Sequence, residues 1–267
     1  MNNLGKVLNH KKLNDEKVLV AYLVAGDPDL ENSLDLMHLL VEAGVDIIEL
    51  GVPFTDPIAE GPVIQKAHDR ALKKNTDFKS IMNLVNKFRI SDPQTPIILM
   101  GYINTFVTNK KLINMKDNGI DGVLVVDIPG EFNLADYEIN NENIDSISLI
   151  SPTTSDDRIK TIVDQSSGFI YYVTLRGVTG SSHFDKSEIE FNIKKIKNLS
   201  NMPVMAGFGI KSTEDAALLA SYSDGVVIGS SIVDLIDKNS DKKDFESVKE
   251  YVTCLLYTSD AADDLLC

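Results

Sequence analysis

The sequence has very little cysteine. Only Cys254 and Cys267 occur, and both lie within the last fourteen residues. A disulfide framework, a cysteine metal site and cysteine redox chemistry are therefore excluded for the body of the chain. No stretch approaches the ~18 apolar residues that a membrane-spanning helix needs. The polar beginning also lacks the apolar core of a signal peptide, so we expect a cytoplasmic protein with no membrane partner.

Positive charge is in deficit as well. Lysine and arginine number 26 against 40 aspartate and glutamate, which gives a net charge of −14. The mean field of such a surface repels a nucleic acid, so we expect no nucleic acid partner. Hydrophobic residues make up 43% of the chain, which is ordinary for a globular protein and excludes a disordered one.

Several chemical motifs are missing. Residues 207–209 lack the third glycine of a dinucleotide fingerprint, and residues 209–212 lack the Gly-Lys-Ser/Thr order of a phosphate-binding P-loop. No Gly-x-Ser-x-Gly elbow of a serine hydrolase occurs. No metal site is predicted, because the histidines are scattered without paired spacing: His10, His38, His68 and His183.

What is present is an alternation of short β-branched runs with segments of helical period, which is typical of an α/β fold. The apolar runs are continuous, which favours parallel strands buried on both faces. Eight such units in about 250 residues predict a single (β/α)₈ TIM barrel, with an open doubly wound sheet as the alternative. The expected strands are Val18–Ala25, Asp46–Gly51, Ile97–Gly101, Gly122–Asp127, Ser146–Ile150, Phe169–Thr174, Val204–Gly207 and Gly225–Gly229.

The domain organisation follows from the lack of any Pro/Gly/Ser-rich linker or short repeat. Residues 1–252 are predicted to form one barrel domain. Residues 253–267 show no clear helical or strand period and break off from the helical pattern before them. We interpret this tail as non-native sequence, with a frayed native C-terminus as the alternative.

Glu49 is the first candidate for chemistry. It ends an apolar run and has the parity of Val45 and Ile47, which would point it into the barrel if those residues face inward. Barrel active sites lie at the carboxyl ends of the strands. A buried carboxyl there favours its neutral form and suits a general acid or base. The alternative is a carboxylate held by a neighbouring backbone N–H or basic group.

A long segment, residues 51–72, follows Glu49 and carries Asp56 and Glu60. Loops longer than a simple turn usually carry function. Either acid could pair with Glu49 at the barrel opening. The alternative is that Asp56 forms a turn beside Pro57, while Glu60 favours the N-terminus of the next helix.

Glycines gather after each of the last three expected strands, in residues 176–180, 206–210 and 227–231. Glycine lets backbone N–H groups approach a ligand, and barrels bind phosphate with the last two loops and a short extra helix. Ser230–Ile236 is the candidate for that helix. Backbone donors would allow so acidic a chain to bind a phosphate without a lysine cluster.

With these motifs the chain resembles the tryptophan synthase alpha subunit family from about Val18 through Val252. The match runs through ELGVPFTDPIAEGP from Glu49 to Pro62, then Ile64-Gln65 and Arg70-Ala71-Leu72. Gly177-Val178-Thr179-Gly180, Gly207-Phe208-Gly209-Ile210 and Gly229-Ser230 follow in family order and spacing.

The resemblance implies a lyase of tryptophan biosynthesis that cleaves indole-3-glycerol phosphate to indole and glyceraldehyde 3-phosphate. It implies that Glu49 is the general acid/base and that the carboxylate at position 60 binds the indole N–H. Substrate-binding residues implied in the same way are Tyr22, Met100, Tyr102, Tyr171 and Thr179. The implied phosphate-binding residues are Gly180, Gly209, Gly229 and Ser230.

The sequence departs from the family pattern at two places. The family has aspartate where this chain has Glu60, and one added methylene moves the carboxylate by about 1.5 Å, where errors near 1 Å can cost on the order of 100-fold in rate. Leu175-Arg176 places a positive charge one position later than usual. A second hypothesis is therefore a catalytically weak subunit that binds phosphate ligands and activates its partner. A third, another phosphate-binding barrel isomerase, does not account for the loop from Pro53 to Pro62.

The resemblance also implies a partner. The family's alpha subunit joins a beta subunit that carries pyridoxal phosphate, in an alpha2-beta2 heterotetramer, and needs no cofactor or metal itself. Pro53, Asp56 and Pro57 are the candidates for contact with the beta subunit. Their alternative role is loop geometry alone.

Overall fold

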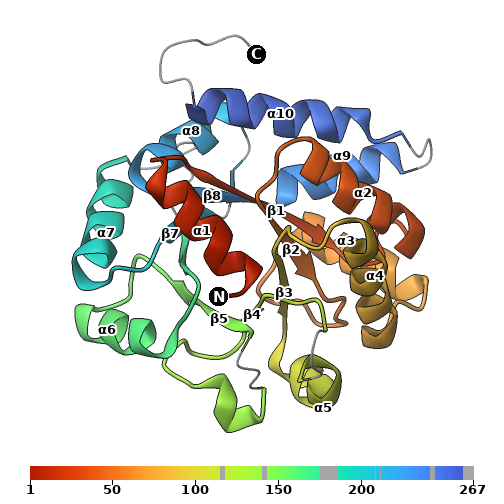
Figure 1. The fold of residues 1–267 in the computed structure, drawn as a ribbon, viewed down its shortest axis with the longest axis horizontal. Helices are drawn as coiled ribbons and strands as arrows, with labels where there is room; N and C mark the ends of the chain where they lie inside the picture. The colour runs from red at the N-terminus through yellow and green to blue at the C-terminus, as the bar shows by residue number, and fades with distance from the viewer. Residues whose placement is uncertain are drawn as a thin grey trace.

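The computed structural model describes residues 1–114, 118–139, 143–174, 186–207, 209–210, 212–240 and 244–260. In these ranges a closed ring of parallel strands is surrounded by helices (Figure 1). The strands are β1 Val18–Val24, β2 Ile47–Gly51, β3 Ile97–Gly101, β4 Gly122–Val125, β5 Asp145–Ile150, β6 Ile170–Val173, β7 Val204–Gly207 and β8 Gly225–Ile228.

The strands pair in chain order, and β1 closes the ring on β8. The predicted (β/α)₈ barrel is therefore confirmed, and the open doubly wound sheet is wrong. Every expected strand is found, with ends that shift by at most two residues. The shifts fall at strand ends, where hydrogen bonding to the neighbouring strand stops and the apolar sequence pattern determines the boundary least.

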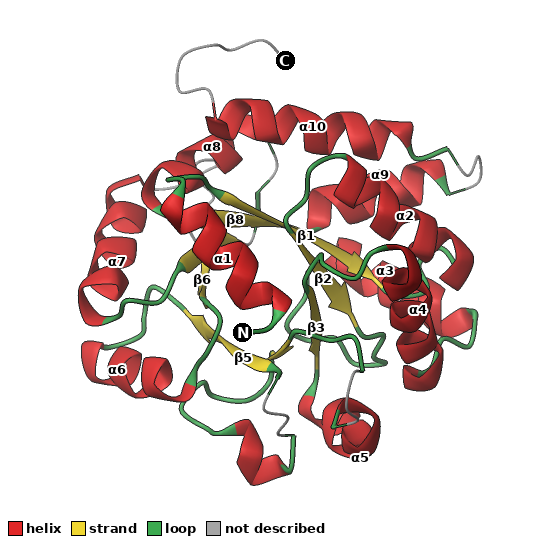
Figure 2. Ribbon diagram, in the orientation of Figure 1, coloured by secondary structure: helices red, strands yellow, loops and turns green. Residues whose placement is uncertain are grey.

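Apart from the first helix, which lies across one end of the ring, the helices lie outside the strand ring (Figure 2). After β4 the described chain forms only a short 3₁₀ turn, η1 Leu134–Tyr137. The α-helices are α1 Asn3–Leu13, α2 Leu30–Glu42, α3 Pro62–Lys73, α4 Phe78–Ser91, α5 Ile103–Ile113, α6 Asp156–Gln165, α7 Lys186–Leu199, α8 Thr213–Tyr222, α9 Ser230–Asn239 and α10 Glu246–Asp260.

Local sequence explains where several helices begin. Asp29 caps α2 by accepting a hydrogen bond from the Asn32 N–H, and Asp77 caps α4 through the Ser80 N–H. Such side-chain acceptors satisfy N–H groups that have no partner inside the helix. α3 instead begins with Pro62, whose missing N–H costs nothing at the first helical position.

Alternate strand residues divide the core in two. Even-numbered residues of β1 and β3 and odd-numbered residues of β2 and β6 face the barrel interior, where Val20, Ile47, Ile98 and Phe169 pack together. Their neighbours face the surrounding helices in the larger outer core. This is the pattern expected of strands buried on both faces.

The amino-terminal end of the barrel is closed by α1. This helix lies across the ring of strands in Figure 1. Its Leu4 and Leu8 are buried and join the interior cluster. The interior is thus packed with aliphatic side chains at this end, which leaves the carboxyl ends of the strands, here called the barrel mouth, for chemistry.

The C-terminal segment differs from the sequence-based expectation. α10 does not end at Val252 but continues to Asp260. Leu255 is 2% exposed in the outer core, and Leu256 lies against Gly44 in the turn before β2. The expected break after Val252 is therefore wrong, because apolar residues of the tail keep helical contact with the core. The origin of residues 253–267 stays a prediction.

Candidate active site

Glu49 lies on β2 at the barrel mouth. Ile47, two residues earlier, is in the interior cluster, as the parity argument requires, while Val45 precedes the strand and packs in the outer core. The Glu49 side chain is buried, and its Oε1 has no hydrogen-bond partner within the described part of the chain. Burial, and secondarily the charge of Glu60, raises the pKa of Glu49 to about 8. The carboxyl therefore holds a proton at neutral pH.

Glu60 reaches the same mouth from the loop between β2 and α3. The Tyr102 hydroxyl donates a hydrogen bond to Glu60 Oε2 and accepts one from the Ala59 N–H at 3.0 Å. Burial raises the pKa of Glu60, while the hydrogen bond from Tyr102 lowers it. Glu60 rather than Asp56 is the acid that the loop brings to Glu49, because Asp56 is exposed. Glu60 also makes no cap for α3, whose N-cap is Gly61.

The loop after β2, residues 52–61, is held by its own residue Phe54. The Phe54 ring stacks on Tyr102, with centroids 4.6 Å apart and planes inclined by 16°. The Phe54 backbone N–H donates to His68 Nδ1 at 3.0 Å. Through these contacts the loop is attached both to the end of β3 and to the inner face of α3.

His68 was not singled out by sequence reasoning, which treated it as one of four scattered histidines. In the structure it is 1% exposed, and its Nε2 lies 3.5 Å from the Tyr22 hydroxyl and 3.9 Å from Glu60 Oε1. Burial lowers its pKa to about 4, so the ring is neutral near pH 7. The available signal was its place in the apolar stripe Ile64, Ala67, His68 and Ala71, which has helical spacing and faces the barrel.

Two tyrosines occupy the mouth over glycines. The Tyr22 hydroxyl lies where a Cβ on Gly51 would approach to 2.3 Å, and the Tyr171 hydroxyl lies where a Cβ on Gly207 would approach to 2.6 Å. Only glycine leaves room for these rings. Burial raises the pKa of both tyrosines well above the usual value. The charges of Glu60 and Glu49 raise it further at Tyr22, and that of Glu49 does so at Tyr171. Both hydroxyls therefore stay protonated. Met100, on β3, is half-buried beside the same interior clusters.

The last two strands end at an open helix N-terminus. α9 begins at Ser230 with Gly229 as its N-cap, and no side chain among the described residues caps it. The Ser231 hydroxyl donates to the Ile210 carbonyl at 2.8 Å, which ties this helix to the loop after β7. Gly209 in that loop has φ +74°, a conformation that suits glycine. Free N–H groups at a helix N-terminus form an anion site, so this end suits a phosphate.

The remaining predicted substrate residues, Thr179 and Gly180, lie outside the described residues, as does Arg176. Among the predicted partner contacts, Pro53 is buried, while Asp56 is exposed and Pro57 is half-buried. The same loop exposes 82% of Ile58, which the sequence argument did not single out. The accessible part of this loop therefore runs from Thr55 to Ala59.

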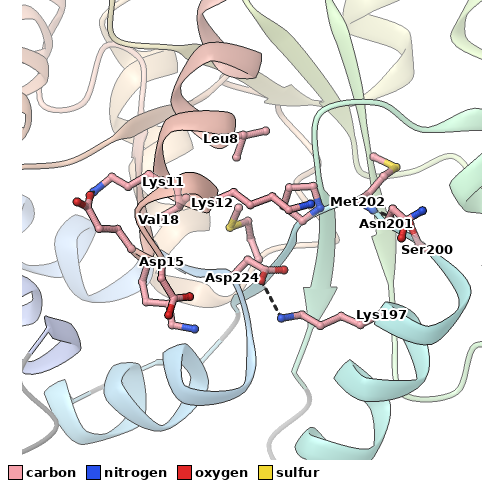
Figure 3. A pocket seen from close by; sticks show the side chains of 14 residues that line it. Leu8, Lys11, Lys12, Asp15, Val18, Lys197, Ser200, Asn201, Met202 and Asp224 are labelled. Atoms are coloured by element: carbon pink, nitrogen blue, oxygen red, sulfur yellow. Dashed lines mark hydrogen bonds and ion pairs between the residues drawn. The ribbon is translucent and has the colours of Figure 1, made fainter.

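A cavity of about 220 Å³ opens at the opposite end of the barrel. Its lining includes Lys11 of α1, Val18 at the start of β1 and Lys197 near the end of α7 (Figure 3). Lys11 pairs with Asp46, and Lys197 pairs with Asp224 at 2.8 Å. These lysines are already neutralised, and the cavity lies away from Glu49. Across the described ranges, no group of three potential metal-binding side chains was found, and no helix is long and apolar enough to span a membrane.

Comparison with known proteins places this geometry in a family. Residues 8–261 match the family model described as tryptophan synthase alpha chain. The tryptophan synthase alpha chain of Marinobacter nauticus is 43% identical, over 100% of this chain and 99% of its own length. That of Nitrosomonas europaea is 39% identical, over 99% and 98%. The crystal structure of tryptophan synthase subunit alpha from Legionella pneumophila str. Paris superposes with a TM-score of 0.89 at 36% identity, covering 97% of this chain and 99% of that one.

Proposed function

The chain belongs to the tryptophan synthase alpha chain family, and from that membership we propose how its own residues perform the family reaction. It is an alpha subunit of tryptophan biosynthesis and a carbon–carbon lyase whose reaction is the cleavage of indole-3-glycerol phosphate. The products are indole and glyceraldehyde 3-phosphate. The assignment of individual steps to residues is our proposal.

Glu49 is the proposed general acid and base. Its buried, protonated carboxyl protonates the indole ring at C3, which places positive charge on the ring nitrogen. The resulting carboxylate then takes the proton from the glycerol hydroxyl on the carbon attached to the ring. The bond between that carbon and C3 breaks, its electron pair restores the aromatic ring, and an aldehyde forms. Glu49 ends the cycle protonated, so the balance of protons is closed.

Glu60 is the proposed partner of the indole N–H. When C3 is protonated, the N–H becomes more acidic and its positive charge needs a nearby anion. The Tyr102 hydroxyl binds one carboxylate oxygen of Glu60, which supports an ionised and oriented carboxylate in spite of burial. The extra methylene relative to aspartate is taken up by a side chain that reaches back to Tyr102. We therefore propose an active enzyme rather than a weak binding subunit.

The other site residues orient the substrate. Tyr22, Met100, Tyr102 and Tyr171 surround the indole and glycerol, and Thr179 belongs to the loop after β6. The phosphate is bound by Gly180, Gly209, Gly229 and Ser230. The free N-terminus of α9 supports this part of the proposal, because its dipole and N–H groups favour an anion. These steps use carboxylates and hydrogen bonds, so we propose no metal or cofactor in this chain.

The family implies a beta-subunit partner. We propose that this partner carries pyridoxal phosphate, consumes the indole and forms an alpha2-beta2 complex. The contact would involve the loop after β2 through Asp56, Pro57 and Ile58, because these lie at the accessible side of the loop. Pro53 would act from beneath, by fixing the loop against the barrel.

The observation that carries the proposal is the burial of the Glu49 carboxyl at the barrel mouth, which together with the charge of Glu60 raises its pKa to about 8. The test is indole release from indole-3-glycerol phosphate, measured with and without a beta subunit. We expect Glu49→Gln to abolish release and Glu60→Gln to reduce it by about 100-fold or more, as for loss of a group that stabilises transition-state charge. Glu31→Gln, an exposed carboxyl on α2, is the matched control and should be unchanged.

Glu60→Asp separates the two readings of position 60. Unchanged or faster turnover in this variant, with an active parent, supports glutamate as a working substitute. A silent parent in both settings, with turnover restored by Glu60→Asp, would show that this chain is a binding and activating subunit.

A further inference from the structure

The inner face of α3 presents a histidine to the barrel mouth where the rest of the stripe is apolar. His68 is flanked on this face by Ile64, Ala67 and Ala71, and Ala67 and Ala71 are fully buried. A buried polar side chain costs free energy unless its hydrogen bonds are satisfied. The ring is therefore expected to have partners on both nitrogens, and their identity determines what it can do.

The first partner fixes the tautomer. The Phe54 backbone N–H donates to Nδ1 at 3.0 Å, so Nδ1 is an acceptor and carries no proton. A neutral imidazole has one donor and one acceptor nitrogen, so the proton is on Nε2. The neutral state agrees with the buried environment, which outweighs the nearby Asp69 carboxylate and holds the pKa of His68 at about 4.

The second nitrogen faces the reacting groups. Nε2–H lies 3.5 Å from the Tyr22 hydroxyl and 3.9 Å from Glu60 Oε1. The other oxygen of Glu60 accepts a hydrogen bond from Tyr102. The carboxylate is thus flanked by a donor group on each side. Catalytic contacts are often long without substrate and tighten in the complex, so 3.9 Å is a reasonable resting distance.

We propose that His68 is a positioning residue for the lyase reaction: its Nε2–H directs the Glu60 carboxylate toward the indole N–H and holds the Tyr22 hydroxyl beside it. This inference rests on the proposed role of Glu60. It also explains how a glutamate serves at position 60. The carboxylate at the end of this longer side chain lies between the Tyr102 hydroxyl and His68 Nε2.

Two substitutions separate the two nitrogens. His68→Asn keeps an acceptor near Nδ1 for the Phe54 N–H but has no donor at the position of Nε2. His68→Gln places an amide donor near Nε2 and gives up the Nδ1 acceptor. We expect His68→Asn to lower kcat by about 10- to 100-fold with KM changed far less, as when an orienting partner is lost. His68→Gln should recover most of that loss. His10→Asn, on the exposed face of α1, is the matched control and should leave kcat unchanged.

A second set of variants tests whether His68 acts through Glu60. In a Glu60→Gln background, His68→Asn should add no further loss of kcat, because the group that it positions is already gone. Equal losses in both backgrounds would overturn the proposal, as would wild-type kcat in His68→Asn while Glu60→Gln is inactive. Wild-type kcat in Glu60→Gln would instead contradict the proposed function of Glu60 itself.

The tautomer gives a test that needs no substitution. In the wild-type chain labelled with ¹⁵N-histidine, the ¹⁵N chemical shifts of the His68 ring at pH 7 should show a neutral ring with its proton on Nε2. A ring protonated on Nδ1, or on both nitrogens at pH 7, would overturn the proposal even if the asparagine variant fails to fold.

Discussion

Glu49 is buried in an environment that destabilises its ionised form. Water, backbone donors and basic groups would each stabilise the ionised carboxylate, but burial raises its pKa from 4.5 to about 8. Between these two pH values the unfolded chain has lost the proton that the folded chain keeps. The folded protein therefore becomes less stable as the pH rises from about 4.5 to about 8, and below 4.5 the penalty disappears.

Glu49→Gln should consequently produce an inactive but more stable protein. Its free energy of unfolding relative to wild type should increase by about 1.4 kcal/mol per pH unit through this window, as an upper estimate. The gain reflects an active-site group that is costly to bury. Urea unfolding at pH 5, 6, 7 and 8 measures it, with exposed Glu31→Gln as a flat control. A difference that stays constant with pH would contradict the raised pKa of Glu49.

At this scale the sequence predicted the acids better than their surroundings. Glu49 could be placed by strand parity, and Glu60 by its loop. The partners of Glu60 could not be predicted, because Tyr102 and His68 come from β3 and α3 and meet only when the barrel closes. The tautomer of His68 depends on a single backbone N–H of Phe54, which no residue pattern encodes.

Helix α10 shows how an element can extend beyond its apparent pattern. The helix packs against α8, α2 and α9, on the outside of the helices that cover the strands. Leu255 and Leu256 continue the buried face of Val248 and Val252. The sequence pattern past Val252 is weak, yet tertiary contact of these leucines is sufficient to keep the helix going, because packing outweighs local propensity.

Truncation after Val252 should therefore destabilise the chain, and truncation after Leu256, which keeps Leu255 and Leu256, should destabilise it less. Removing Leu255 alone exposes a core position, and losing a buried leucine costs about 2–5 kcal/mol. Thermal melting of both truncated chains beside the full chain measures the difference. Equal melting temperatures in all three would show that the segment past Val252 is inert and contributes nothing to the core.

In the whole molecule, the parts that form the packed interior differ from the loops that we expect to contact substrate and partner. The strands and α1 form the packed interior, whereas the exposed side chains at the mouth belong to connecting loops. Order and type of the strands were predictable because each strand is a continuous apolar run between helices. The short 3₁₀ turn after β4 was not predictable in the same way. The residues after Val125 carry turn signals and lack the apolar stripe of an α-helix, but this pattern does not say which short structure replaces the helix.

Ile58 is the residue through which the loop after β2 should bind the beta subunit. It is 82% exposed beside Asp56 and Pro57, and an isolated apolar side chain at a barrel mouth gains most when a partner covers it. Ile58→Asp should weaken binding to the beta subunit by about 10-fold or more while melting is unchanged. Ile90→Asp, 85% exposed at the end of α4, is the matched control. Isothermal titration calorimetry with the beta subunit measures the affinity of each variant. Equal affinities for both variants would exclude Ile58 from the contact.

Helix α1 closes the amino-terminal end of the barrel, and this limits the routes by which small molecules can enter and leave. Leu4 and Leu8 of α1 cover an interior already filled by Val20, Ile47 and Ile98. No small molecule can travel along the barrel axis through this packed column. Substrate must therefore enter, and indole must leave, through the barrel mouth, to which the loop after β2 also belongs. Cleavage therefore releases indole only at the barrel mouth, on the side where Asp56 and Ile58 are exposed.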